Sequence, residues 1–538
     1  MMIDDEVAPD ASMGPQAGYG LRRAALTGLV LLAGSLAACG GGGGDDAGGS
    51  TLPASSVYAG KCAPDNTLAL DSAGNLQSRY ISGTLADEKT WVRSYLDEAY
   101  LWYQEVPQVD AALAPYNVSP AQFALDAWFE ALKTPAVTAS GVRKDQFSFT
   151  MPTAEWNALA QTGVVGGYGI EWALASPTPP RNARVAYVEA GSQAASGGVF
   201  RGDTVVALVV DGAQIDFVNT TVPAEIDKLN TAMFSPVQGR QTTFRLRSNA
   251  GVERDVALTA AQVTTTPVKE AKVLEAADGK VGYLLFNDFI VPGEGQLKAA
   301  IQGFQDAGVR DLVLDLRYNG GGYLYMASQL AYMIAGPART SGKTFERSIY
   351  SDKRSTATNS PSNDLQFFNS SSGMSGSGTT ANSPLPNLAL DRVFVLATAG
   401  TCSASESVVN GLRGVDVEVV VLGAATCGKP YGFTARDNCG LSYFPVEFQG
   451  VNQKGFGEFA DGFAPTCVVA DDLGNPLGSE SEGLLAAALA YRGGASCAAI
   501  AAGGTTVKDA RGASGPAATI VRPPWRNSKF LVSGAGTP

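Results

Sequence analysis

The stretch DRVFVLATAGTCSASESVVNGL, residues 391–412, contains a change of pattern that decides the fold. DRVFVLA has the apolar character of a buried strand, and the residues after the serines are expected to form a helix. The alternation extends to both sides: VGYLLFNDF, RDLVLDL and VEVVVLG are further apolar runs of strand type, and GQLKAAIQGFQDAG and LYMASQLAYMIAG have a helical pattern. We therefore expect layered α/β structure from about residue 280 onward.

The segment from Ser403 to Glu406 lies where the expected helix begins, and it has two interpretations. A serine followed three positions later by a glutamate is a capping box, in which the serine caps the helix and the glutamate reaches back to the backbone. A helix N-terminus also presents free N–H groups and the positive end of a dipole, which suit an oxyanion. The segment alone does not distinguish a structural cap from a serine nucleophile.

A serine nucleophile requires a base, and the chain contains no histidine. This excludes a Ser-His-Asp triad. A lysine can serve instead if burial lowers its pKa from about 10.4 toward neutrality. Lys429 stands in the small and apolar segment TCGKPYG, directly after VEVVVLG and 26 residues past Ser403. It is the candidate base.

The order strand, TCSASE, helix, strand, TCGK resembles the C-terminal processing (tail-specific) serine protease family. The resemblance implies that Ser403 is the nucleophile and Lys429 its general base, and that Ser405 matches a second serine that is not the nucleophile. It covers about residues 80–495. It implies an endopeptidase that cuts exported proteins.

A third motif, LDLRYNGGGYL at residues 314–324, is similar to the family's strand followed by Asn-Pro-Gly-Gly, with Gly320 in the proline position. Glycine allows a backbone N–H to approach a substrate carbonyl closely. The resemblance therefore implies an oxyanion hole formed by Gly321 and Gly322 together with the N–H of Ala404.

The chain departs from the family in two places. Phe433 stands where many relatives have a glutamine that orients the lysine. Asp416 lies two positions farther from the serine than the helper aspartate of some relatives, so it is left out of the catalytic set. Phe433 favours an alternative, a catalytically inactive peptide-binding scaffold of the same fold. A second alternative is a Ser-Lys hydrolase of cell-wall or small acyl substrates.

Between residues 160 and 265 the pattern changes to short β-like runs with glycine turns. The run ARVAYVEAGSQAASGGVFRGDTVVALVVDG resembles a PDZ domain of the bacterial protease type, which speaks against a small-molecule substrate. Such a domain binds an extended peptide at a strand edge and its terminal carboxylate at backbone N–H groups. The segment Gly167, Tyr168, Gly169 and Ile170 would form that carboxylate cradle. The alternative is a β-rich spacer.

Six segments follow from these patterns. They are a lipoprotein signal peptide (1–38), a flexible linker (39–75), a small helical N-terminal domain (76–155), a β-rich PDZ domain (160–265), a layered α/β Ser-Lys protease domain (266–500) and a C-terminal tail (501–538). Within the tail, IVRPPWRNSKFLV at residues 520–532 could dock as a strand.

The N-terminal segment predicts export. Two arginines precede an apolar run of 15 residues, Ala24 to Ala38, which is shorter than the about 20 residues of a membrane-spanning helix. The ending Leu-Ala-Ala-Cys resembles a bacterial lipobox and implies lipidation of Cys39. Gly40 favours the outer membrane, with the protein facing the periplasm or the cell surface. The alternative is a secretory signal that is cleaved without lipidation.

Six further cysteines in an exported chain predict disulfides. Two of them flank the candidate site, so we hypothesise a Cys402–Cys427 bond that holds the serine against the lysine, which leaves the pairs Cys439–Cys467 and Cys62–Cys497. Without histidine or a Cys-x-x-Cys pair, no metal site is expected, and no cofactor is implied.

The composition limits the partners. The 538 residues suffice for about three domains, and a net charge of −12 argues against broad attraction to nucleic acid or anionic lipid. We expect protein or peptide substrates, and membrane contact through the lipid anchor alone. The oligomeric state stays open.

Overall fold

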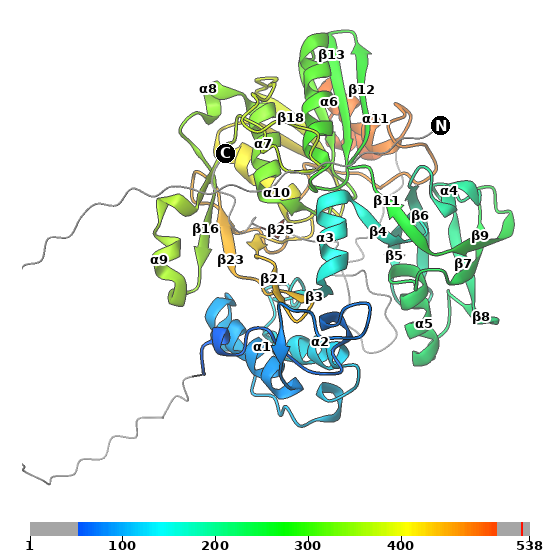
Figure 1. The fold of residues 1–538 in the computed structure, drawn as a ribbon. Coiled ribbons are helices and arrows are strands. Elements are labelled where there is room, and N and C mark those ends of the chain that lie inside the picture. Colours follow the sequence, from blue (N-terminus) through cyan, green and yellow to red (C-terminus); the bar gives the residue numbers. More distant parts are fainter. Residues whose placement is uncertain (1–51, 503–528, 531–538) are drawn as a thin grey trace, which may run out of the picture. The chain divides into compact units, whose positions relative to one another are not determined.

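The computed structural model describes residues 52–502 and 529–530. Its α/β domain is built on a six-stranded sheet. The strand order is β12 (Val268–Ala276), β13 (Gly279–Phe286), β14 (Asp311–Asp315), β18 (Arg392–Ala397), β19 (Glu418–Gly423) and β24 (Cys467–Val468). Strands β12, β13 and β18 are labelled at the top of Figure 1. β12 is antiparallel to β13, and every later pair is parallel.

Helices cover both faces of this sheet. One core contains apolar residues of α6 (Gly293–Ala307), α7 (Leu324–Ala335) and α10 (Ala404–Gly414), and a second contains those of α11 (Gly483–Arg492). Leu312 and Leu314 belong to the first core and Val313 to the second, as the two-residue period of a strand requires. The α/β layering expected from the sequence is confirmed.

Two smaller sheets belong to the same part of the chain. The first has the order β17 (Asp364–Gln366), β16 (Thr344–Tyr350), β23 (Phe448–Val451) and β20 (Tyr431–Gly432), and the second the order β21 (Arg436–Asn438), β22 (Leu441–Phe444) and β3 (Phe149–Pro152). The short helices α8 (Pro337–Thr340) and α9 (Ser355–Thr358) lie on either side of β16 in the sequence.

The helical region consists mainly of α1 (Leu85–Ala99) and α2 (Ala121–Ala131). Thr84 and Asp87 form a capping box at the start of α1. The aromatic residues of α1 and α2 share one core with Tyr431, Tyr443 and Val446. The region therefore packs directly against the segment that follows Lys429.

Residues 164–264 form a β-rich domain where the sequence predicts the PDZ domain, and we keep that name for it. Its main sheet has the order β10 (Glu253–Thr259), β9 (Gln241–Arg247), β7 (Thr204–Val210), β6 (Asn182–Val188) and β5 (Ile170–Ser176), with β8 (Ala213–Asp216) on β7. Two helices, α4 (Gln193–Ser196) and α5 (Pro223–Phe234), complete it, and β4 (Val164–Gly167) pairs with β11 (Ala261–Thr264) after α3 (Thr153–Thr162). One apolar core joins the sheet and α5.

The expected flexible linker is wrong for residues 52–75. The structure has η1 (Ser55–Val57), β1 (Lys61–Cys62) and η2 (Thr67–Ala69) there, and β1 pairs in parallel with β2 (Ile81–Ser82). The buried Glu88 accepts hydrogen bonds from the Ala63 N–H (2.8 Å) and the Asn66 amide (3.0 Å). These long-range bonds order a segment that has no periodicity of its own. Residues 39–51, including Cys39, and the signal peptide lie outside the described residues.

Three disulfides join Cys402 with Cys427, Cys62 with Cys439, and Cys467 with Cys497. The hypothesised first pair is confirmed, and the pairs Cys439–Cys467 and Cys62–Cys497 are wrong. The turn between β21 and β22 places Cys439 beside β1, whereas Cys497 begins α12 (Cys497–Ala502) beside β24. Within the part of the chain that the structure describes, no helix has both the length and the apolar composition needed to cross a bilayer.

Candidate active site

The three sequence motifs follow three neighbouring strands. β14, β18 and β19 are adjacent and parallel, so the loops after them leave the same edge of the sheet. We name them the oxyanion loop (316–322), the serine loop (398–403) and the lysine loop (424–429). The fold thereby gathers the predicted catalytic residues from segments far apart in sequence.

Ser403 lies at the start of α10 with φ 64° and ψ −113°. A residue other than glycine rarely adopts this conformation, and such strain persists only where surrounding contacts impose it. The side chain is fully buried, and its hydroxyl has no hydrogen-bond partner within the described residues. The cap expected from the sequence is therefore half formed: Glu406 reaches back to the Ser403 N–H, but the Ser403 hydroxyl does not bond the helix.

Glu406 connects the serine loop to the lysine loop. One carboxylate oxygen accepts hydrogen bonds from the backbone N–H groups of Ser403 (2.8 Å) and Lys429 (2.9 Å). The other accepts them from the Thr426 hydroxyl (2.6 Å) and the Gly428 N–H (2.9 Å). Both oxygens thus face two donors each, and a single buried side chain sets the separation of the two loops.

Burial raises the pKa of the Glu406 carboxyl above its ordinary value, and these four hydrogen bonds act in the opposite direction. All four neighbours of the carboxylate are donors, so the ionised form is the one that satisfies them.

The disulfide Cys402–Cys427 joins the same two loops, with the Cα atoms 5.1 Å apart. The Cys427 N–H also donates to the Thr401 carbonyl at 3.0 Å. Covalent and hydrogen-bonded links therefore surround the residues that precede Ser403 and Lys429.

Lys429 is fully buried among aromatic rings. Its Nζ lies 4.2 Å from the centroid of the Phe433 ring and 5.3 Å from that of Phe147. Phe433 packs edge-on against Phe149 and Phe444, so its ring has a fixed orientation. Phe433, which replaces the glutamine of many relatives, therefore contacts the lysine directly.

Asn319 organises the oxyanion loop. Its Nδ2 donates to the Phe286 carbonyl (2.9 Å), and its own carbonyl accepts hydrogen bonds from the Cys402 N–H and the Ser405 hydroxyl (both 3.0 Å). Its Oδ1 accepts the Gly321 N–H at 2.9 Å. Gly321, an expected oxyanion donor, is thus already paired in this state. Within residues 52–502, the N–H of Ala404 has no acceptor.

Gly322 begins the short strand β15 (Gly322–Tyr323) at φ 136°. A Cβ at this position would lie 2.3 Å from the Phe289 carbonyl oxygen, so only glycine fits.

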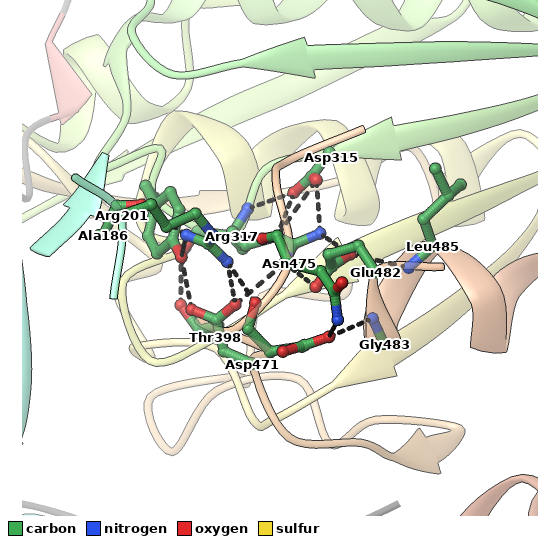
Figure 2. Close-up of polar contacts among 12 residues, drawn as sticks. Ala186, Arg201, Asp315, Arg317, Thr398, Asp471, Asn475, Glu482, Gly483 and Leu485 are labelled. Carbon is green, nitrogen blue, oxygen red and sulfur yellow. Dashed lines mark hydrogen bonds and ion pairs between the residues drawn. The ribbon is translucent and has the colours of Figure 1, made fainter. Parts of the chain in front are cut away.

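A charged cluster lies beside the oxyanion loop (Figure 2). Arg317 is fully buried and forms ion pairs with Asp315 (2.7 Å), Glu482 (2.6 Å) and Asp471 (2.9 Å). Because Arg317 stands two residues before Asn319, these bonds fix the start of the loop that carries the glycines.

Arg201 of the PDZ domain joins the same cluster. Its guanidinium donates to Asp471 at 3.0 Å (Figure 2). It also donates to the hydroxyl of Tyr318 (2.6 Å), which itself donates to Asp471 (2.5 Å). Burial acts to raise the pKa of the Asp471 carboxyl, but Arg317 and Arg201 outweigh it and hold the pKa below its ordinary value. Hydrogen bonds and an ion pair thus connect the PDZ domain to Tyr318, a residue of the oxyanion loop.

The predicted peptide-binding residues form a second site. Gly167, Tyr168, Gly169 and Ile170 line a pocket together with Met233 and Phe234 of α5. A Cβ at Gly169, which has φ 81°, would lie 2.2 Å from the Ser192 Cβ, so glycine is required. Within the described residues, the N–H groups of Tyr168 and Gly169 have no acceptor. The Tyr168 side chain belongs to the PDZ core, and its hydroxyl donates to the Thr242 hydroxyl at 3.0 Å. Only the backbone of Tyr168 is therefore available to bind a peptide carboxylate.

Sequence reasoning missed two residues of the catalytic region. The sequence indicates Glu406 only as a helix cap, whereas in the structure it also binds residues 426–429 of the lysine loop. Asn319 stood in the quoted motif without a role. An asparagine before a glycine triplet, directly after a strand, was the available signal.

We predict that Glu406→Gln abolishes activity and destabilises the protein. In either amide orientation the NH₂ group faces at least one backbone N–H that cannot turn away. We expect the free energy of unfolding to fall by about 3 kcal/mol. Urea unfolding measures the loss, with the exposed Glu418→Gln as the matched control. Equal stability of both variants would contradict the bridging role of Glu406.

We predict that Asp471→Asn weakens the charged cluster in a pH-dependent way. A depressed carboxyl pKa stabilises the fold above the ordinary value of about 4, and this contribution is lost as the pH falls through the lower folded pKa. At neutral pH the variant should be less stable than wild type by about 2 kcal/mol. The difference should shrink below about pH 4. A pH-independent difference in urea unfolding would refute the linkage.

Comparisons with known proteins agree with this geometry. Residues 280–437 match the sequence profile of peptidase family S41, and no curated protein matches the chain. The crystal structure of a candidate S41 protease from Bacteroides fragilis is 26% identical with a TM-score of 0.53, over 75% of this chain and 97% of that one.

Two further solved structures are similar. The photosystem II D1 C-terminal processing protease is 18% identical with a TM-score of 0.43, over 75% of this chain and 98% of that one. The PDZ domain of a carboxy-terminal protease from Vibrio cholerae, in complex with a peptide, is 15% identical with a TM-score of 0.16, over 19% of this chain and 97% of that one. The profile match covers the strands that carry the serine and the lysine. Residues 280–437 therefore form a peptidase family S41 domain, and the chain is a serine-type peptidase.

Proposed function

We propose that this peptidase is an endopeptidase with a Ser403-Lys429 dyad. One observation carries the proposal: the strained Ser403, whose hydroxyl is unpaired within the described residues, is tied through Glu406 and through Cys402–Cys427 to the loop that holds the buried Lys429. A base must be neutral to accept a proton, and burial favours the neutral form of an amine.

The reaction follows from this arrangement. The Ser403 Oγ attacks the substrate carbonyl while Lys429 takes the hydroxyl proton, and the charge that develops on the carbonyl oxygen is stabilised at the N-terminus of α10 by the Ala404 N–H. Lys429 then gives the proton to the leaving amine, and an acyl-enzyme remains. A water molecule, deprotonated by Lys429, attacks the ester, and Lys429 returns the proton to the Ser403 Oγ as the new C-terminal acid leaves. Gly321 can add a second donor when its N–H turns from Asn319 toward the oxyanion.

The ring of Phe433 supports a catalytic rather than an inactive protein. It lies against the Lys429 amine and is held by neighbouring rings. The phenylalanine thus offers a different way to position the base than a glutamine would. This contact weakens the sequence argument for an inactive scaffold.

The PDZ domain would capture substrates by exposed C-terminal ends. The free N–H groups of Tyr168 and Gly169 suit a carboxylate, and the adjoining pocket is lined by apolar residues of α5. A substrate whose C-terminus is amidated should therefore be cut more slowly than one with a free carboxylate. Equal rates would remove this part of the proposal.

We place the protein outside the cytoplasm, anchored by a lipid on Cys39 and facing the periplasm or the cell surface. The lipobox-like sequence and the three disulfides support export, because disulfides persist in oxidising compartments. Unchanged membrane association of Cys39→Ala would contradict the anchor.

The decisive assay uses residues 40–538 with an unfolded protein substrate. We predict cleavage by wild type, and a loss of about a thousandfold or more for Ser403→Ala and Lys429→Ala. Lys429→Arg should be equally inactive, because arginine stays protonated. The exposed Lys343→Ala is the matched control and should retain full activity. Substantial activity in Lys429→Ala would exclude the dyad.

A further inference from the structure

The strand β15, which leaves the oxyanion loop, has two edges. On one edge, the Phe289 N–H donates to the Gly321 carbonyl (3.0 Å) and the Tyr323 N–H donates to the Phe289 carbonyl (2.8 Å). Alternate residues of a strand direct their polar backbone groups to opposite sides. The N–H and C=O of Gly322 therefore point to the other edge, directly beside the candidate oxyanion hole.

The second edge is occupied by the chain itself. β25 (Lys529–Phe530) pairs with β15 in parallel, with Gly322 opposite Lys529 and Tyr323 opposite Phe530. β25 also lies within 8 Å, between Cα atoms, of β20, which begins two residues past Lys429. It thus runs between the strand that follows the oxyanion loop and the strand that follows the lysine loop.

A substrate bound as an extended strand requires this same edge of β15. Its scissile carbonyl has to reach Ser403 and the oxyanion donors, and an extended peptide gains affinity by pairing with an open strand edge. In the described state Ser403 and Lys429 are both fully buried, so a substrate reaches them only after a local rearrangement. β25 pairs only with β15 among the strands that the structure describes, so its departure leaves every other pairing intact.

We propose that the edge of β15 at Gly322 is the docking surface for the substrate strand, in the parallel orientation, and that β25 (Lys529–Phe530) occupies it as an internal competitor. The inference rests on the proposed serine-lysine chemistry for its effect on rate. Its structural part, the binding of the segment to this edge, does not depend on activity.

The binding experiment uses a fluorescein-labelled peptide of residues 520–532 and two Ser403→Ala chains, one ending at residue 538 and one at residue 527. Fluorescence anisotropy should show binding to the shorter chain and at least about tenfold weaker binding to the longer one, whose own segment competes. A peptide with Lys529→Pro and Phe530→Pro should also bind about tenfold more weakly, because proline cannot donate to a strand ladder. Equal affinity of both peptides, or of both chains, would overturn the proposal.

The rate experiment compares active chains ending at 538, at 532 and at 527 on an unfolded protein. The chain ending at 527 should have a kcat/KM about tenfold higher than the other two. Full-length Lys529→Pro/Phe530→Pro should be activated similarly, which guards against misfolding of the truncated chain. If no chain cuts, the proposed function fails and the peptide binding still decides this inference. If all chains cut equally, the inference alone fails.

Discussion

The buried carboxylate of Glu406 is the interaction on which the catalytic region depends. Its four hydrogen bonds reach the backbone of Ser403 on one side and residues 426–429 on the other, so one side chain fixes both the proposed nucleophile and the loop of the proposed base. A carboxylate suits this role because it only accepts hydrogen bonds, and all four partners are donors. The same contacts hold Ser403 at φ 64°, a conformation that an isolated chain would leave.

Two kinds of contact surround this carboxylate: a buried charge network and a short pairing of two strands. The start of the oxyanion loop is fixed by the ion pairs that Arg317 forms with Asp471 and Glu482. Arg201 connects this cluster to the PDZ domain through Asp471. Such buried charge networks are costly to break once formed. By contrast, β15 pairs with β25 over only two residues. The described state therefore combines a densely bonded frame around Ser403 with one short strand pairing beside it.

The sequence predicted the α/β layering and the placement of Ser403 and Lys429, because apolar strand runs are local signals and parallel neighbours end at one edge. It did not predict what depends on distant partners. Cys439 pairs with Cys62, and residues 52–75 are ordered by contacts with Glu88 and residue 439, which no local pattern reveals. The role of Phe433 was also hidden, since the contact of its ring with the lysine follows from the packing of Phe149 and Phe444.

The central claim is that Lys429 activates Ser403, and a fluorophosphonate tests it directly, because the serine oxygen displaces fluoride only when it is activated. Folded wild type, residues 40–538, is treated with the reagent and digested, and the modified peptide is located by mass spectrometry. The account predicts one phosphonate on Ser403 in wild type and none in folded Lys429→Ala. A wild type that stays unmodified at Ser403, or equal modification of Lys429→Ala, would contradict it.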